Sequence, residues 1–253
     1  MENTLTSQEE YIERFIAKGT IVLLSLLLVF TVASAQAING DGKSQRKTYH
    51  VSSYSSIEIH TPLNVYLTND TGAIVIEADS NIVPHIQVKA EKGTLLIKND
   101  PGVWFNSKTI IKVLIPAEKV TSIKNIGSAD INTINFKLTG PSVQIVNVGS
   151  GKIKVALDCN DLKVSGKGSA DFELSGKTQR AVINLSGSGD IRAQELSTNA
   201  VDLRLNGSCN AWVNCLDKLS VHIPLISSGT VYYKGSPQIK KTGWGGSIEK
   251  FVL

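Results

Sequence analysis

Gly187-Ser188-Gly189-Asp190-Ile191 is the clearest copy of a short motif that recurs through the second half of the chain and decides its fold. The motif runs glycine, serine, a small residue, a polar residue and an apolar residue. Its copies begin at residues 127, 149, 168, 187, 207 and 227, which by subtraction are 22, 19, 19, 20 and 20 residues apart. A period of about 20 residues is typical of a solenoid, in which each copy is one supersecondary unit.

Apolar residues stand at fixed distances on either side of this turn motif. Four residues before it the column reads Ile123, Ile145, Val164, Ile183, Leu203 and Ile223, and four residues after it Ile131, Ile153, Phe172, Ile191, Ala211 and Val231. The intervening positions are mostly polar, and this alternation predicts strands with one buried face. Each copy is therefore predicted to be a strand, a tight turn, a second strand and a connecting stretch. Glycine suits the turn because it reaches positive φ, and the structural turn glycines are Gly127, Gly149, Gly168, Gly187 and Gly207.

A unit of this length cannot bury its own apolar face, so it must stack on its neighbours, roughly 4.8 Å apart. The alternative is a series of antiparallel hairpins, since strand, glycine turn and strand is also a hairpin signal. A meander would reverse the order of the columns in alternate strands, whereas the columns stay in phase through six copies. We therefore predict an all-β fold, a parallel β-helix or solenoid with rungs of about 20 residues, preceded by non-repeating capping strands.

The chain divides into four predicted segments. Residues 1–35 read as a signal peptide, because Arg14 and Lys18 precede the apolar run of residues 20–32 and Ala33-Ser34-Ala35 forms a cleavage site. An uncleaved membrane anchor is the alternative, and a membrane is expected as a partner only in that case. Residues 36–48 are predicted to be a flexible mature N-terminus, residues 49–116 β capping strands, and residues 117–253 solenoid repeats with a C-terminal cap made by Pro237 and Trp244. We expect an exported protein of the periplasm, the outer membrane or the cell surface.

Charge and cysteine content restrict the function. The formal net charge is +4, and removal of residues 1–35, with two basic and four acidic residues, would make it +6. This charge is not concentrated in a block, and nothing resembles a nucleic-acid-binding module. Cys159, Cys209 and Cys215 form no obvious pair and have no metal-ligand spacing, so we interpret them as small buried or turn residues. No nucleophile elbow or phosphate loop is present, and we expect neither an enzyme nor a cofactor.

The chain resembles an exported family called putative auto-transporter adhesin, head GIN domain. The residues that carry the resemblance are Ser56-Ile57-Glu58-Ile59, Leu63-Asn64-Val65-Tyr66-Leu67, Gly93-Thr94-Leu95-Leu96-Ile97, the turn motifs, and Tyr233-Lys234-Gly235-Ser236-Pro237. The resemblance covers roughly residues 50–250 and implies an exported bacterial β-solenoid with an adhesin-like role. It supplies no catalytic motif. Lys152 and Cys209-Asn210 depart from the family's pattern without threatening the fold.

The polar position of the motif forms a column of Asp130, Lys152, Asp171, Asp190, Asn210 and Thr230. In a solenoid Asp171 and Asp190 would be adjacent carboxylates, able to bind calcium or to serve as acid and base in polysaccharide cleavage. We favour a third interpretation, in which these side chains accept hydrogen bonds from nearby backbone N–H groups and cap the turns.

Arg192, Trp212 and Tyr232 share one outward position in three consecutive copies. Aromatic rings beside an arginine on a flat β-face are typical of surfaces that bind sugars or proteins, so we predict a binding face here, for a glycan or a surface protein. The preferred hypothesis is an exported, non-enzymatic β-solenoid that is an adhesin-like binding or scaffold protein of the envelope. The alternatives are a carbohydrate-active β-helix enzyme that uses Asp171 and Asp190, and a structural envelope polymer. The sequence names neither the ligand nor the oligomeric state.

Overall fold

A computed structural model describes residues 36–70 and 72–251, and the fold below is the compact unit Ala37–Leu253. The predicted signal peptide, residues 1–35, lies outside the described residues. Within the described part of the chain, no helix has the length and apolar character needed to cross a membrane.

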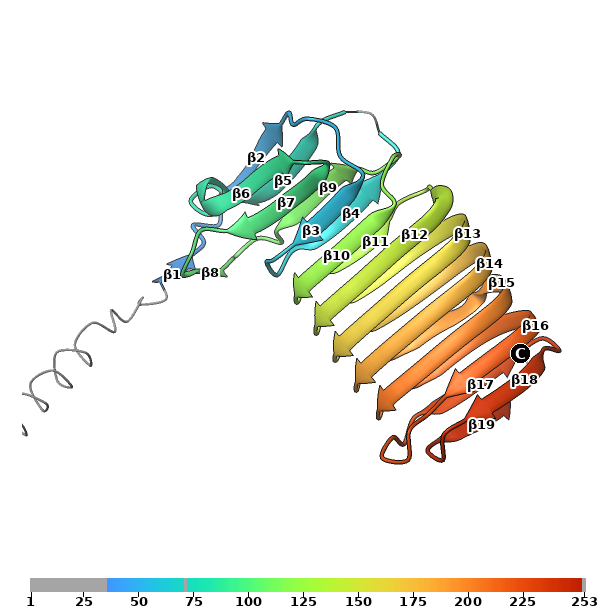
Figure 1. The fold of residues 1–253 in the computed structure, drawn as a ribbon. Helices are drawn as coiled ribbons and strands as arrows, with labels where there is room; N and C mark the ends of the chain where they lie inside the picture. The colour runs from blue at the N-terminus through green and yellow to red at the C-terminus, as the bar shows by residue number, and fades with distance from the viewer. Residues whose placement is uncertain (1–35, 71, 252–253) are drawn as a thin grey trace, which may run out of the picture. The chain divides into compact units, whose positions relative to one another are not determined.

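The second half of the chain is a parallel β-solenoid (Figure 1). Its strands stack in chain order with parallel pairing, and the central ones are 17 residues long. The predicted parallel β-helix, with one rung for each copy of the motif, is therefore confirmed. The strands are β10 (Ser122–Gly127), β11 (Asp130–Thr133), β12 (Leu138–Gly149), β13 (Lys152–Gly168), β14 (Asp171–Gly187), β15 (Ile191–Gly207), β16 (Ala211–His222), β17 (Thr230–Lys234), β18 (Gln238–Thr242) and β19 (Ser247–Lys250).

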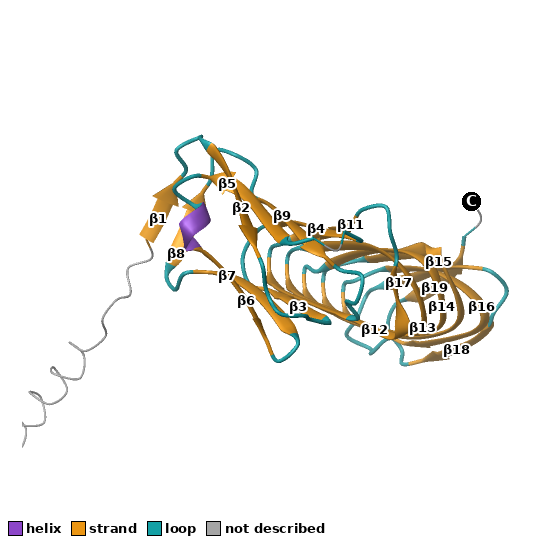
Figure 2. Cartoon of the chain, turned by 90° about the horizontal axis from the view of Figure 1, so that it is seen from above, coloured by secondary structure: helices purple, strands orange, loops and turns teal. Residues whose placement is uncertain are grey.

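The core consists of files of side chains that run along the solenoid axis, inside the nested turns seen in Figure 2. One file contains Ile145, Val164, Ile183 and Leu203, which pair in register and are at most 1% exposed. Phe172 occupies the file on the other side of the turn and is fully buried. Full burial of one such side chain contributes roughly 1.5–3 kcal/mol, so the stacking of turns accounts for the cohesion of the solenoid.

The stretches that the sequence predicts to be connections are β-strand in the structure. Between β13 and β14 the ladder runs without interruption through Leu157 and Gly176, and Cys159 pairs with Thr178. The chain bends at Gly176, where φ is +106° and a Cβ would lie 2.1 Å from the carbonyl oxygen of Leu157. The central turns β13, β14 and β15 are therefore each one long bent strand, because backbone groups at the bend still find partners on the neighbouring turns.

The last copy of the repeat differs from the predicted column by two residues. Val221, and not Ile223, pairs with Leu203 in the buried file. This two-residue shift in register, called the slip below, places two extra residues in the loop between β16 and β17, where Leu225 and Ile226 are exposed. The turn motif itself returns to register, since the N–H of Ser228 donates to the carbonyl of Gly207 as Ser208 does to Gly187.

The N-terminal strands continue the parallel ladder before they end it. β3 pairs in parallel with β10 and with β7, and β4 pairs in parallel with β11 and with β9. Antiparallel pairing of β6 with β7 and of β5 with β2 and β9 then ends the ladder. The elements are β1 (Gln36–Asn39), β2 (Ser44–Tyr49), β3 (Ser56–Ile59), β4 (Asn64–Thr68), β5 (Ile74–Asp79), the 3₁₀ helix η1 (Val83–His85), β6 (Ile86–Glu91), β7 (Thr94–Asn99), β8 (Val103–Asn106) and β9 (Lys112–Pro116).

The polar start of the described chain differs from the flexible segment that the sequence predicts for residues 36–48. β1 pairs with β8, and β2 pairs with β5 along its whole length. Asp79, which is fully buried, holds this region in place: its carboxylate accepts hydrogen bonds from the backbone N–H groups of Gly42 and Lys108. A polar segment is ordered here because partners distant in sequence satisfy its backbone.

At the other end, the predicted cap differs from the structure. Trp244 lies in the loop between β18 and β19 and is 87% exposed, so it covers nothing. The described solenoid ends in β18 and β19, which pair with β16 and β17 respectively.

Candidate functional site

The three residues that the sequence proposes as a binding face belong to a longer row on the outer surface. Lys154, Glu173, Arg192, Trp212 and Tyr232 pair in register from β13 to β17. Their side chains point outward because each follows a buried residue of the core in the alternating strand. We call these five residues the outer row; the structure thus brings Arg192, Trp212 and Tyr232 together.

The aromatic half of the outer row is a stack along the solenoid axis. The rings of Trp212 and Tyr232 have centroids 5.1 Å apart and planes inclined by 14°. The guanidinium of Arg192 lies 5.3 Å from the centroid of Trp212, on the turn before it. Both faces of the indole are therefore covered, one by Arg192 and the other by Tyr232. Trp212 offers a ligand its edge and its N–H group, and no free ring face for a sugar.

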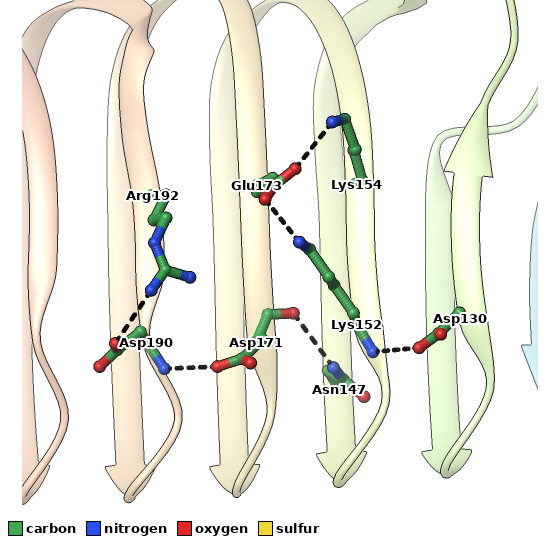
Figure 3. A network of polar contacts seen from close by, with 8 residues as sticks. All are labelled: Asp130, Asn147, Lys152, Lys154, Asp171, Glu173, Asp190 and Arg192. Carbon is green, nitrogen blue, oxygen red and sulfur yellow. Dashed lines mark hydrogen bonds and ion pairs between the residues drawn. The ribbon is translucent and has the colours of Figure 1, made fainter.

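The charged half of the outer row is a network of ion pairs (Figure 3). The carboxylate of Glu173 lies 2.9 Å from the ammonium of Lys154 and is also bonded by Lys152. Hydrogen bonds from Lys152 and then Lys154 lower the pKa of Glu173 below its usual value. Arg192 approaches Asp190 at 3.5 Å. Glu173 and Asp190 are thus paired with basic groups, and the side chains of Lys154 and Arg192 remain partly exposed.

A hollow of about 170 Å³ opens beside the row, between β13, β14 and β15. A register shift between Glu173 and Ser175 creates it, since β15 is one residue longer there: Glu173 pairs with Arg192, but Ser175 pairs with Glu195 and not with Gln194. β-Bulges of this kind re-aim side chains and are over-represented near functional sites. The residues that line the hollow are Lys154, Glu173, Leu174, Ser175, Arg192, Gln194 and Glu195.

Gln194 gives the hollow a group that lacks a partner. Its Oε1 atom is buried, and no hydrogen-bond donor reaches it among the residues that the structure describes. A buried amide oxygen without a donor is unfavourable by about 1–3 kcal/mol, and a ligand hydroxyl could supply the missing hydrogen bond once the amide turns toward the hollow. The motif pattern misses Gln194, because its apolar columns lie four residues from the turn and Gln194 is seven residues after Gly187. The longer interval between the motif copies at Gly187 and Gly207 is the one sequence signal of the bulge.

The aspartates of the turn motif accept hydrogen bonds from the next turn. Oδ1 of Asp171 accepts from the backbone N–H of Asp190 at 2.9 Å, and Oδ1 of Asp190 accepts from the N–H of Asn210 at 2.9 Å. Asp130 and Asn210 do the same for Lys152 and Thr230. These side chains therefore cap the turns, as the favoured interpretation has it. Within residues 36–70 and 72–251, no group of three or more potential metal ligands comes together.

The glycines of the turn motif occupy the same place on successive turns. Their φ angles are +133°, +137°, +91°, +128° and +126° at Gly127, Gly149, Gly168, Gly187 and Gly207. At Gly187 a Cβ would lie 2.2 Å from the carbonyl oxygen of Gly168, so both the backbone conformation and the close stacking of turns require glycine there.

The three cysteines are buried and unpaired in the part of the chain that the structure describes. Burial raises the pKa of each thiol above its usual value. Cys159 lies 3.5 Å from the hydroxyl of Thr178 and Cys215 lies 3.2 Å from the carbonyl of Lys218. Since a reactive cysteine needs exposure and a lowered pKa, these thiols are packing residues.

Comparisons with known proteins agree with this architecture. A protein-family model described as "Putative auto-transporter adhesin, head GIN domain" matches residues 53–237. The crystal structure of a putative adhesin from Bacteroides fragilis is 29% identical, with a TM-score of 0.76, over 85% of this chain and 100% of that one. A putative lipid binding protein from Parabacteroides distasonis is 21% identical, with a TM-score of 0.72, over 86% and 100%. A putative adhesin from Parabacteroides merdae is 19% identical, with a TM-score of 0.63, over 86% and 100%. The last two show likeness of fold alone, and none of the curated proteins matches the chain.

Proposed function

The chain belongs to the family of the putative auto-transporter adhesin, head GIN domain, and from this premise we propose that it is an exported, adhesin-like binding protein of the cell envelope. Its ligand is an acidic glycan, held at the outer row and the adjoining hollow. The solenoid is the scaffold that fixes this site, and it performs no catalysis.

The hollow beside Gln194 is the observation that carries the proposal. We infer that the side-chain amide of Gln194 turns toward the hollow when the ligand binds, so that Oε1 accepts a hydrogen bond from a sugar hydroxyl and is no longer buried without a partner. Arg192 and Lys154 line the same hollow and can pair with a carboxylate or sulfate of the sugar. The site is set on two long strands that pair on both sides of the bulge, which limits the backbone rearrangement needed when the ligand binds.

The covered faces of Trp212 change the expected mode of binding. A sugar that stacks on an aromatic ring needs a free ring face, and Arg192 and Tyr232 occupy both faces of this indole. We assign Trp212 the role of orienting Arg192 by a cation–π contact, with its N–H group available at the rim.

Glycan-array binding by the full chain tests the proposal. We expect Arg192→Gln and Gln194→Leu each to weaken binding of an acidic glycan at least about tenfold, since each removes one hydrogen bond to the ligand. Arg204→Gln, an exposed arginine on the same strand β15, is the matched control and should bind normally. Trp212→Phe retains a ring against Arg192 and should bind better than Trp212→Ala. Equal binding by all these variants would exclude the site.

Export rests on the N-terminal sequence. We propose that residues 1–35 act as a signal peptide and are removed before Gln36. Mass spectrometry of the N-terminus of protein recovered from the cell envelope checks this, and an intact Met1 on the envelope protein would favour the uncleaved anchor.

The enzyme alternative requires free carboxylates at Asp171 and Asp190. Each has one oxygen engaged by a backbone N–H of the next turn, which favours a structural role. Release of reducing ends from acidic polysaccharides, abolished by Asp190→Asn, would support the enzyme instead. The structural-polymer alternative predicts sedimentation of assemblies larger than a monomer, built through the terminal strands β18 and β19.

A further inference from the structure

Three large apolar side chains are almost fully exposed to solvent at the C-terminal end of the solenoid. Leu225 and Ile226, in the loop between β16 and β17, are 74% and 89% exposed, and Trp244, in the loop between β18 and β19, is 87% exposed. We call residues 224–227 and 243–246 the apolar loop pair. Neither the turn motif nor the core accounts for these side chains.

The two loops touch each other. The N–H of Gly245 donates to the carbonyl of Ile223 at 3.2 Å, and a Cβ on Gly245 would lie 2.0 Å from the carbonyl oxygen of Pro224. Figure 1 shows both loops beside β17 and β19 at the last turns. Leu225, Ile226 and Trp244 therefore belong to one apolar surface that sequence separation hides.

The backbone conformation of the two loops keeps these side chains exposed. Ile223 is fully buried and fixes the start of the first loop, and the register slip of two residues extrudes Leu225 and Ile226 beyond it. Trp244 stands between Gly243 at φ +81° and Gly246 near φ +51°, so its neighbours have no side chains to cover the indole. Exposed apolar patches on a folded domain mark contact surfaces.

The stretch of chain that contains the apolar loop pair carries charge of one sign. No acidic residue occurs between Lys218 and Glu249, whereas Lys234, Lys240 and Lys241 lie in that interval. The ammonium of Lys241 donates to the carbonyl of Gly246 at 2.9 Å, which places a positive charge at the base of the Trp244 loop. An apolar tip with a lysine at its base complements a layer that is negatively charged outside and apolar inside.

We propose that the apolar loop pair docks on an anionic lipid surface. Leu225 and Ile226 enter the boundary of the acyl chains, Trp244 lies at the headgroup level as tryptophan does in membrane proteins, and Lys241, at the base of the Trp244 loop, faces the anionic headgroups. A second copy of the chain fits less well, because a stable protein interface needs roughly 1,200–2,000 Å² of complementary surface, and two narrow loop tips offer little area. This docking uses none of the residues that line the hollow of the proposed glycan site.

Fluorescence of single-tryptophan variants tests the proposal in the full chain. Trp104→Phe with Trp212→Phe leaves Trp244 as the emitter, and the matched control, Trp212→Phe with Trp244→Phe, leaves Trp104, which is 64% exposed. Phosphatidylglycerol-containing vesicles should shift the Trp244 emission to the blue, and brominated acyl chains should quench it. The Trp104 emission should change little. Because the readout is local, binding through any other part of the chain would not imitate it.

The strength of binding gives a second measurement. Leu225→Ser with Ile226→Ser should weaken partitioning into these vesicles at least about tenfold, and Ile110→Ser, a 65% exposed isoleucine in the loop between β8 and β9, should not. Lys241→Gln and added salt should also weaken it. An unchanged Trp244 emission with vesicles would overturn the proposal. So would a blue shift in buffer alone that grows with protein concentration, since it would assign the loops to a contact between copies.

Discussion

Asn125 and Asn147 lie on consecutive turns inside the solenoid, and the side-chain amide of Asn125 donates to Oδ1 of Asn147 at 3.0 Å. Both residues are fully buried. The amide of Asn125 also donates to the carbonyl of Ala129, and that of Asn147 to the carbonyl of Gly151. A short asparagine ladder thus satisfies carbonyl groups of the first two turn motifs, at positions that Gly166 and Leu185 fill on the next turns.

Replacement of Asn147 tests this ladder. Asn147→Leu leaves the carbonyl of Gly151 and the amide of Asn125 without this partner, so we expect the free energy of unfolding to fall by about 1–3 kcal/mol. Asn184→Leu, which alters an exposed asparagine of β14, is the control and should change stability little. Denaturant titration measures both. Equal stability of the two variants would show that the ladder is energetically neutral.

The turn glycines give a comparison within one motif. Gly187 and Gly127 have φ angles of +128° and +133°, but a Cβ would lie 2.2 Å from the oxygen of Gly168 in the first case and would meet nothing within 4 Å in the second. Gly127→Ala should destabilise the protein through backbone strain alone, by about 1–2 kcal/mol. Gly187→Ala should lower the thermal unfolding temperature further, because adjacent turns must separate. The reverse order would contradict the proposed close stacking.

Asp79 makes stability depend on pH. Burial would raise the pKa of Asp79, but hydrogen bonds from the hydroxyl of Ser107 and from the N–H groups of Thr109, Lys108 and Gly42 outweigh it and lower the pKa from 3.8 to about 2. A lowered pKa stabilises the fold above pH 3.8, and this contribution is lost as the pH falls through about 2.

We therefore expect wild-type stability to decline over this acid range. Asp79→Asn replaces the carboxylate, which accepts these hydrogen bonds, by an uncharged amide. The variant should be less stable at neutral pH, and its stability should fall less steeply below pH 3.8. Asp217→Asn, at an exposed position, should retain the wild-type decline. Unfolding followed by circular dichroism across the acid range measures this, and a parallel decline in both variants would place the linkage elsewhere.

The buried thiols report on the integrity of the solenoid. Cys209 and Cys215 are fully buried and Cys159 is 6% exposed, and burial raises the pKa of all three thiols. We expect a thiol-specific reagent to modify none of them in the native protein and all three in denaturant. Rapid labelling under native conditions would show that the turns open readily or that the cysteines face solvent.

The sequence by itself determined the class of fold. The motif spacing and the in-phase apolar columns predict parallel stacking, and the burial of Ile145, Val164, Ile183 and Leu203 confirms it. A solenoid is predictable in this way because each unit contacts only its neighbours, so local period and global contact coincide. For the same reason, the shared register of Arg192, Trp212 and Tyr232 follows from counting residues.

Only the tertiary structure decided the features that depend on contacts outside the repeat. Residues 36–48 are held by Asp79, whose carboxylate accepts a hydrogen bond from the N–H of Gly42. The two residues are far apart along the chain, so no local sequence pattern predicts this contact. Two features arise where one turn has more or fewer residues than its neighbour. One is the register shift that exposes Leu225 and Ile226, and the other is the bulge beside Gln194. Motif spacing shows that one turn has more residues than the next, but it does not show where the extra residue lies. That position is set by the backbone partners and the buried side chains of the adjacent turn.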